Sequence, residues 1–261
     1  MTGHIQFEEA GPLARVTIVH AGKFNAMSRT MWRELKAVFE DLPARRDLRA
    51  VIIAGEGGHF CAGGDIAEYP SFRFDEAALR AFHEVEVWGA LQAMLCCDVP
   101  LLAQIDGNCM GAGLEISSCC DIRVAGASAK FGAPIARLGF PMAPREAQLV
   151  AGAVGLPTAR EMLLEAAVLD APTLLARGFL NAVVADGDVN LEVARRATCI
   201  TALAPLAARL NKQTLRALGP TASEATSQTL DGLARVAYAY ADSQEHREGI
   251  SAFLDKRKPV F

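Results

Sequence analysis

Residues 100–126 read PLLAQIDGNCMGAGLEISSCCDIRVAG, and this stretch determines the fold that we expect. Its short apolar run Leu101–Ile105, which follows a proline and precedes Asp106-Gly107, predicts a buried strand that ends in a turn. The small residues Gly111-Ala112-Gly113 come next, and an apolar helical stretch begins at Leu114. The pattern therefore predicts a strand, a turn of small residues and a helix in close succession.

A turn of this kind can bind a negatively charged oxygen. The first N–H groups of a helix lack partners within the helix and lie at the positive end of its dipole. Small residues at the junction let a ligand approach the backbone closely. The stretch therefore offers N–H donors to an oxyanion, with the carboxylate of Glu115 at the start of the helix. On this stretch alone, a small-residue turn that only packs a helix against a sheet is an equally good interpretation.

A second stretch repeats the arrangement. Residues 59–66 read HFCAGGDI, and they follow another buried-strand run, Ala50–Ala54, and a glycine-rich loop, Gly55–Gly58. One such turn is weak evidence of function, whereas two turns can each supply one N–H group to the same carbonyl oxygen. The two stretches together favour an oxyanion-binding site over simple packing.

These motifs, in their order and spacing, resemble the crotonase superfamily (enoyl-CoA hydratase/isomerase family). The resemblance implies an α/β fold with a crotonase-like ββα spiral core and a helical C-terminal trimerisation region. It implies an acyl-CoA thioester substrate, with coenzyme A present only as part of that substrate, and no permanently bound cofactor. Because members share a thioester site and differ in chemistry, it does not fix the reaction. The motifs are Phe60–Ile66, Asp106-Gly107, Gly111–Glu115, Cys120–Ile122, Phe131–Pro134 and Phe253–Pro259, within a resemblance from about Lys23 to Lys258.

The resemblance also implies roles for individual residues. The backbone N–H groups of Gly64 and Ala112 would stabilise the oxyanion, and Glu115 would be the acid–base carboxylate. Relatives often carry glycine at the position of Ala112, and alanine keeps the N–H donor. Asp65 is expected to hold its turn rather than to take part in the chemistry. The residues expected along the CoA moiety and the acyl group are Lys23, Phe24, Ala26, Ala62, Gly64, Asp65, Ile66, Gly111, Pro134, Ile135 and Lys256.

The sequence departs from the family at the second carboxylate. Hydratases of the family usually carry a glutamate directly after the proline equivalent to Pro134, and here that residue is Ile135. They also carry a glycine-rich run where residues 141–146 read PMAPRE. The pair Arg145-Glu146 could replace the missing function or could cap the following helix, and we favour capping. His83, in a predicted helix, is an outside candidate for a polar group near the acyl chain.

Three functions therefore stay open. The first is a lyase or isomerase with Glu115 as its main acid–base group, which catalyses hydration or another reaction such as decarboxylation or hydrolysis. The second is an enoyl-CoA hydratase in which Glu146 or another group replaces the lost carboxylate. The third is a non-catalytic acyl-CoA-binding scaffold, against which the retained Glu115 argues. An apolar pocket around Ile135, Phe140 and Met142 would desolvate Glu115 and raise its pKa.

The composition limits location and partners. The net charge is −4 and the pI is about 5.8, and no basic stripe indicates a nucleic-acid groove. No apolar run reaches about 18 residues, so we expect no membrane span, and residues 1–9 lack a signal-peptide pattern. The seven cysteines include no C-x-x-C pair, and the five histidines are scattered. This usage favours reduced thiols in the cytoplasm over disulfides or a metal site.

Strands alternate with helices at first, and later only helices are predicted. This order indicates an α/β core over residues 1–187 and a helical region over residues 188–261. In the family the latter makes trimer contacts, so we expect a homotrimer or a dimer of trimers. Two alternatives stay open for Lys23 and for the tail Lys256-Arg257-Lys258: they approach CoA phosphates, which for the tail can belong to a neighbouring subunit, or they are solvated. The expected elements are a hairpin of 5–9 and 14–20, strands 50–54, 101–105 and 121–125, helices 29–41, 76–95, 191–203, 206–218 and 224–241, and a turn at 131–134.

Overall fold

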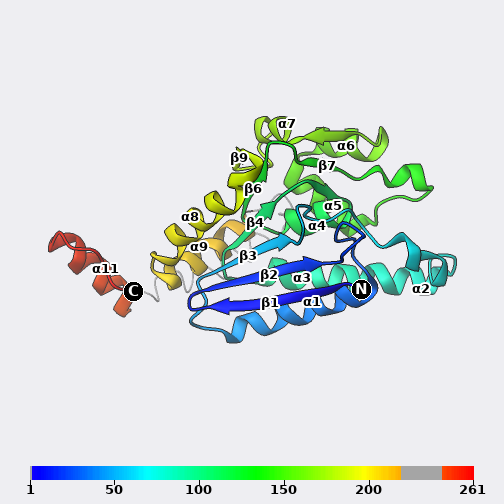
Figure 1. The fold of residues 1–261 in the computed structure, drawn as a ribbon. Coiled ribbons are helices and arrows are strands. Elements are labelled where there is room, and N and C mark those ends of the chain that lie inside the picture. Colours follow the sequence, from blue (N-terminus) through cyan, green and yellow to red (C-terminus); the bar gives the residue numbers. More distant parts are fainter. Residues whose placement is uncertain (1, 219–242) are drawn as a thin grey trace.

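A six-stranded sheet forms the centre of the molecule (Figure 1) in a computed structural model that describes residues 2–218 and 243–261. The strand order is β1-β2-β3-β4-β6-β9; β1 is antiparallel to β2, and all later neighbours are parallel. Inner parallel strands are covered on both faces and read as apolar runs, as β3 and β4 do. The strands are β1 (His4–Ala10), β2 (Leu13–Val19), β3 (Ala50–Gly55), β4 (Leu101–Ile105), β6 (Ile122–Gly126) and β9 (Ala182–Val184).

The N-terminal hairpin and the first helix form as predicted. β1 and β2 pair along their whole length. Helix α1 (Arg29–Asp41) begins after Ser28, whose hydroxyl accepts a hydrogen bond from the backbone N–H of Met31 at 3.2 Å. Serine is a preferred residue at this capping position because it satisfies one of the unpaired N–H groups. The side chains that α1 buries in the main core are Met31, Trp32, Leu35 and Phe39.

The helix predicted over residues 76–95 contains one wider turn. α2 (Glu76–Ala81), a π-helical segment (Phe82–Val87) and α3 (Trp88–Cys96) follow one another without a break. The N–H group that follows the π segment donates to the carbonyl five residues back, at His83. Such π turns often occur at functional sites, and this one carries His83.

A second, three-stranded sheet has the order β5-β7-β8. Its strands are β5 (Asn108–Met110), β7 (Lys130–Gly132) and β8 (Val168–Asp170). The turn predicted at residues 131–134 is therefore wrong in part, because β7 occupies 130–132 and a 3-10 helix (Pro134–Leu138) follows. A strand of three residues is too short to show an alternating pattern, so only its pairing with β5 and β8 defines it.

Helices cover both faces of the main sheet. Along β3, Val51 and Ile53 join the main core with α1 and α3, whereas Ala50 and Ile52 join a second core with α8. Successive strand residues point to opposite faces, so α8 lies on the other side of the sheet from α1. The later helices are α4 (Ala112–Ser118), α5 (Pro144–Val154), α6 (Leu156–Leu164), α7 (Ala171–Ala176), α8 (Val189–Thr201), α9 (Pro205–Ala217) and α11 (Gln244–Leu254). α11 lies at the far end of the molecule from α2 (Figure 1), and the helix predicted over 224–241 lies outside the described residues.

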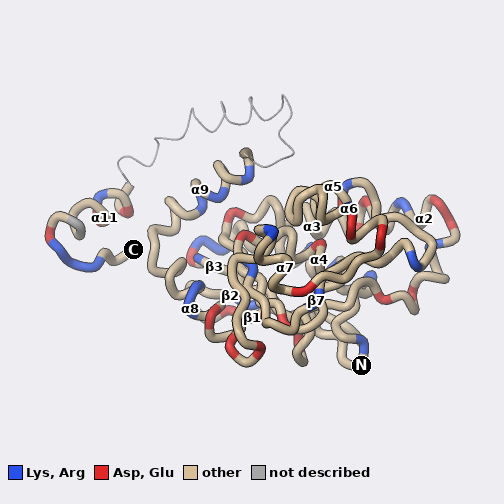
Figure 2. The backbone as a smooth tube through the Cα atoms, turned by 90° about the horizontal axis from the view of Figure 1, so that it is seen from above, with Lys and Arg blue, Asp and Glu red and all other residues tan. Residues whose placement is uncertain are grey.

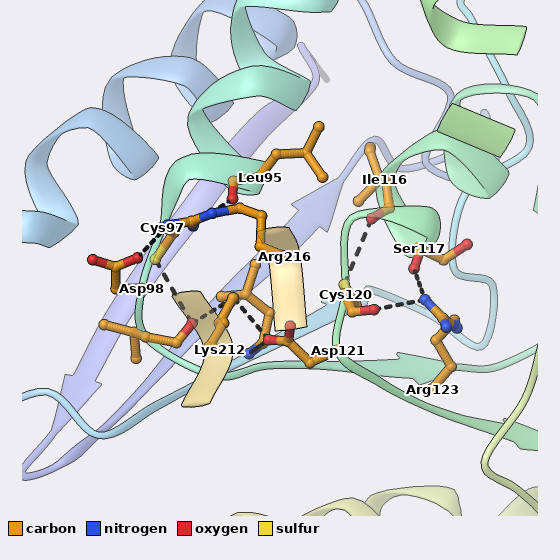
Figure 3. A network of polar contacts seen from close by, with 12 residues as sticks. Leu95, Cys97, Asp98, Ile116, Ser117, Cys120, Asp121, Arg123, Lys212 and Arg216 are labelled. Atoms are coloured by element: carbon orange, nitrogen blue, oxygen red, sulfur yellow. Dashed lines mark hydrogen bonds and ion pairs between the residues drawn. The ribbon is translucent and has the colours of Figure 1, made fainter. Parts of the chain in front are cut away.

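Helix α9 is attached to the loops that precede β4 and β6 (Figure 3). Lys212 Nζ donates to the carbonyl of Val99 at 2.8 Å and pairs with the carboxylate of Asp121 at 2.7 Å. One turn later, Arg216 pairs with Asp98 at 2.8 Å. These contacts hold α9 at the amino ends of the parallel strands. The loops at the opposite, carboxyl ends are where open α/β sheets bind ligands.

Candidate active site

Two turns lie side by side beyond the carboxyl ends of β3 and β4. The N–H of Phe60 donates to the carbonyl of Asp106 at 2.7 Å, and the N–H of Cys61 donates to the carbonyl of Asn108 at 2.9 Å. The N–H of Met110 donates in return to the carbonyl of Cys61 at 2.9 Å. This short parallel pairing places the residues after Cys61 beside those after Met110. The two turns that the sequence predicts to act together are therefore adjacent.

Three glycines allow the turns to come this close. Gly63 has φ +111° and Gly111 has φ +46°, backbone conformations that other residues rarely adopt. A Cβ on Gly113 would lie 2.7 Å from the carbonyl oxygen of Cys61, so α4 can begin here only with glycine at that position.

The predicted oxyanion donors, Gly64 and Ala112, line one cavity. In the part of the chain that the structure describes, neither backbone N–H has a hydrogen-bond acceptor. Ala112 is the first residue of α4, where helix geometry leaves the N–H unpaired. The hydroxyl of Tyr69 lies beside Gly64, so a Cβ added to Gly64 would overlap it. Both N–H groups are therefore available to a ligand oxygen.

The cavity has a volume of about 310 Å³. It lies between α4, α5, the π segment and a 3-10 helix, Ile66–Ser71. The sequence-predicted site residues that it brings together are Ala62, Gly64, Ile66, Gly111, Ala112, Glu115, Pro134 and Ile135. The predicted apolar lining is present, and with Ile135 it includes Trp32, Phe82, Val87, Met110, Leu138, Phe140, Pro141 and Met142.

Glu115 contributes a buried carboxyl group to this cavity. Its backbone N–H donates to the carbonyl of Gly111 at 3.0 Å in the first turn of α4, and the residue is 7% exposed. Burial raises the pKa of Glu115 well above its ordinary value, and the negative charge of Glu146 raises it further. The predicted effect of desolvation is therefore confirmed, and it favours the protonated form of Glu115.

Glu146 is a second buried carboxylate in the cavity, and the capping role that we favoured for it is wrong. α5 begins without a side-chain cap, because Pro144 occupies the start of the helix and has no N–H to satisfy. Glu146 is 3% exposed, and its carboxylate lies 2.7 Å from Nδ1 of His83. Arg145 instead pairs with Glu84 at 3.3 Å. The outside candidate His83 thus lies at the site together with Glu146.

Three polar residues of the cavity were not predicted from the sequence: Arg137, and the neighbouring pair Tyr69 and Arg73. The guanidinium carbon of Arg73 lies 4.6 Å from the centre of the Tyr69 ring and 3.8 Å from that of Phe140, which are cation–π distances. Nη1 of Arg73 also lies 3.4 Å from Nε2 of His83. Burial raises the pKa of Tyr69 to about 12 despite the opposing charge of Arg73, so its hydroxyl stays protonated. None of the three belongs to a motif, so no local signal marks them.

The residues predicted to bind CoA in the N-terminal half form a continuous strip. The N–H of Ala62 donates to the carbonyl of Phe24 at 3.0 Å. Lys23 Nζ pairs with Asp65 at 2.6 Å, and its side chain remains 44% exposed. Asp65 also caps the 3-10 helix that follows it, which supports its predicted role in holding the turn. Phe24 is exposed and Ala26 is buried; CoA binding by this strip stays a prediction.

Lys256 lies apart from the other predicted site residues of the same chain. It follows α11, in the basic tail that Figure 2 shows at the opposite end of the molecule from α2. It is not among the residues that line the cavity. Its predicted role near CoA therefore needs a neighbouring subunit and stays a prediction.

Metal-ligand and thiol chemistry have no visible support in residues 2–218 and 243–261. No group of three or more His, Cys, Asp and Glu side chains there is arranged to hold a metal ion. The cysteines are free thiols, and burial raises the pKa of Cys61, beside the first turn, to about 12. A thiol with so high a pKa is a poor nucleophile. In the same ranges, no helix combines the length and apolar character needed to cross a bilayer.

Comparisons with known proteins identify the family of this chain. The family described as enoyl-CoA hydratase/isomerase matches residues 8–261. The short-chain-enoyl-CoA hydratase of Clostridium acetobutylicum is 27% identical over 98% of this chain and 96% of its own length. The mitochondrial Delta(3,5)-Delta(2,4)-dienoyl-CoA isomerase of Dictyostelium discoideum is 28% identical over 95% of this chain and 87% of its own.

A solved structure extends the match to the whole fold. An enoyl-CoA hydratase/carnithine racemase from Magnetospirillum magneticum superposes on this chain with a TM-score of 0.90 at 38% sequence identity. The superposition covers 100% of this chain and 96% of the Magnetospirillum chain. The mixed α/β fold predicted from the sequence is therefore the fold of the crotonase superfamily. The chain belongs to the enoyl-CoA hydratase/isomerase family.

Proposed function

We propose that this family enzyme acts on an enoyl-CoA thioester through an enolate-like oxyanion, with Glu115 as acid–base group. The observation that carries the proposal is the position of Glu115, which is buried in the same cavity as Gly64 and Ala112. The backbone N–H groups of these two residues have no acceptor within the described ranges. A protonated carboxyl group beside two such donors suits chemistry at a thioester carbonyl and its α-carbon.

The proposed steps of hydration follow from where negative charge develops on the thioester substrate. When water attacks the β-carbon of an enoyl thioester, negative charge moves to the thioester oxygen. Donors aimed at that oxygen stabilise the charge, and losing one typically costs about 2.7–4 kcal/mol. Protonated Glu115 then donates its proton to the α-carbon, and the carbonyl re-forms. In an isomerisation the same carboxyl group would move a proton between two carbons of the acyl chain.

The cavity favours a short, apolar acyl group. Its volume of about 310 Å³ is near the lower end of small-molecule sites, which span about 300–1,000 Å³. The similarity to the short-chain-enoyl-CoA hydratase of C. acetobutylicum supports hydration of such a substrate. We place the CoA moiety along Lys23–Ala26 and Ala62–Ile66, where it enters as part of the substrate, and we propose no resident cofactor.

The assembly is part of the proposal. Residues 1–187 form the α/β core with the acyl-CoA site, and residues 188–261 provide the contacts of a homotrimer or a dimer of trimers. Lys256 of the partner subunit would then bring positive charge to the CoA phosphates. The position of the basic tail, far from the cavity of its own chain, supports this arrangement.

The test is a product assay with wild-type protein. Crotonyl-CoA and a panel of other acyl-CoA esters are incubated with the protein, products are identified by mass spectrometry, and acyl-CoA binding is measured by calorimetry. A 3-hydroxyacyl-CoA or a shifted enoyl-CoA product supports the proposal. A free acid or a decarboxylated product instead indicates hydrolase or decarboxylase chemistry. Binding without any product indicates a non-catalytic acyl-CoA-binding scaffold.

A further inference from the structure

The proposed hydration needs a proton acceptor as well as a donor. Protonated Glu115 can deliver a proton to the α-carbon, but the attacking water must lose one of its own. The family resemblance implies a glutamate at the position of Ile135, whose apolar side chain lines the cavity here and cannot accept a proton. The base must therefore come from another element of the fold.

Two helices present carboxyl groups to the cavity. Glu115 comes from the first turn of α4 and Glu146 from the first turn of α5, and these are the only Asp or Glu residues among the described residues that line it. The charge of Glu146 is near enough to raise the pKa of Glu115. Two carboxyl groups in one cavity, with one biased toward its protonated form, suit an acid and a base.

A chain of three residues fixes the proton on His83. Nη1 of Arg73 lies 3.4 Å from Nε2 of His83, and a guanidinium group can only donate, so Nε2 accepts. The single proton of the neutral imidazole therefore lies on Nδ1, which is 2.7 Å from Oε1 of Glu146. Glu146 thus receives a hydrogen bond. This bond holds the Glu146 carboxylate in place, and the positive charge of Arg73 lies beyond the ring.

Other polar groups also lie near these three residues. Arg137 lines the same cavity, and its Nη2 donates to the carbonyl of Ala166 at 3.0 Å. Glu115, from α4, is itself favoured as the neutral acid, because its own pKa is raised. The high pKa of the Tyr69 hydroxyl keeps that group neutral beside Arg73. On the outer side, Arg145 and Glu84 compensate each other in an ion pair at 3.3 Å.

We propose that Glu146 is the general base of the reaction, positioned by His83 and Arg73, and that it replaces the carboxylate missing at Ile135. An oxygen of Glu146 takes a proton from water as the water oxygen bonds to the β-carbon. The π electrons move to the thioester oxygen, and the proton of Glu115 then forms the new bond at the α-carbon. One proton passes from Glu146 back to Glu115, so the net reaction adds one water. The inference rests on the proposed function.

The experiment measures crotonyl-CoA hydration for variants of this chain. Glu146→Gln should lower kcat by about 10²–10⁴-fold with little change in KM, because the base is lost and the binding surface is kept. His83→Ala should lower kcat less than Glu146→Gln does, with little change in KM. His83→Asn, which keeps an N–H donor near Nδ1, should recover part of the activity. Glu84→Gln, next to His83 on the same helix, is the matched control and should match wild type.

A gain of function tests the same idea. Adding Ile135→Glu to Glu146→Gln restores a carboxylate at the family position and should raise hydration above that of Glu146→Gln alone. Wild-type kcat in Glu146→Gln, with activity lost in Glu115→Gln, would overturn the role of Glu146 and leave the proposed function standing. Wild-type kcat in His83→Ala, or no recovery of activity in His83→Asn, would overturn the positioning role of His83, even if Glu146→Gln failed to fold. If wild type hydrates no enoyl-CoA, the proposed function falls, and this inference with it.

Discussion

The imidazole Nδ1 of His83 lies 2.7 Å from the carboxylate of Glu146, although 63 residues separate the two in the sequence. The π segment presents the ring and the first turn of α5 presents the carboxylate, so the contact depends on how two separate elements pack. Ile135, at the family position of the second glutamate, lines the same cavity with an apolar side chain. The cavity therefore holds two carboxyl groups, Glu115 and Glu146, although the family motifs account for only one.

Replacing Glu115 by glutamine should stabilise the fold at neutral pH. Because burial raises its pKa, the folded chain holds a proton that the unfolded chain releases above about pH 4.3. The stability that this carboxyl group contributes is therefore complete below that pH and is lost as the pH rises through the folded pKa. We expect the Tm of Glu115→Gln to approach that of wild type near about pH 4 and to exceed it increasingly at higher pH. A Tm difference that thermal unfolding finds independent of pH would contradict this.

The Gly64→Ala substitution should remove most activity without unfolding the chain. Its Cβ would overlap the Tyr69 hydroxyl and lie 3.1 Å from the ring carbon Cζ, so the turn must move and carry its N–H group with it. Loss of one oxyanion donor lowers kcat by about 10²–10³-fold. Adding Tyr69→Phe removes the closest contact and should restore part of the activity.

The control for the Gly64→Ala substitution is Gly187→Ala, a glycine outside the site where an added Cβ meets no atom within 4 Å. Its kcat should equal that of wild type. Steady-state kinetics on all three variants checks the prediction. Full activity in Gly64→Ala would show that the N–H of Gly64 does not serve as an oxyanion donor.

Lys212→Met should destabilise the fold and leave the chemistry intact. The change leaves the carbonyl of Val99 and the carboxylate of Asp121 without this donor (Figure 3), which costs about 1–3 kcal/mol in the free energy of unfolding. Lys36→Met is the control, because Lys36 pairs with Glu40 only at the surface, where such pairs contribute about 0.3–0.5 kcal/mol. Urea denaturation measures both values. Equal losses in the two variants would refute the structural role of Lys212.

Lys23→Gln should weaken acyl-CoA binding with little effect on stability. Lys23 is half exposed, so its ion pair with Asp65 contributes only about 0.2–1 kcal/mol to folding. A phosphate near this lysine would lose a charged donor, and the loss should shrink as the salt concentration rises. Calorimetric titration with acyl-CoA at low and high salt measures the effect. An unchanged Kd at low salt would place the CoA phosphates elsewhere.

The sequence predicted the parts of the fold that local patterns specify. β3 is an apolar run and β4 is apolar except for Gln104, and α1 has an apolar stripe after a capping serine, Ser28. The glycines of the two turns are equally local, because the backbone of Gly63 and Gly111 requires their residue type. These signals predicted both the fold and the two adjacent turns of the site.

The parts that the sequence did not predict depend on distant contacts. β7 is three residues long and is defined only by its partners β5 and β8. Glu146 reads locally as a residue near a helix start, and only the packing of α5 beside the π segment brings it to His83. Arg73 reaches the site through its contacts with Tyr69 and Phe140, which no spacing rule indicates.

The most direct test of the account is the rate of crotonyl-CoA hydration by Glu115→Gln, followed through the loss of enoyl-thioester absorbance. Glutamine keeps the size of the side chain and removes the proton that it would transfer. We expect kcat to fall by at least about 10²-fold, while calorimetry still detects acyl-CoA binding. Hydration by Glu115→Gln at the wild-type rate would contradict the assignment of Glu115 as the acid–base group of this enzyme.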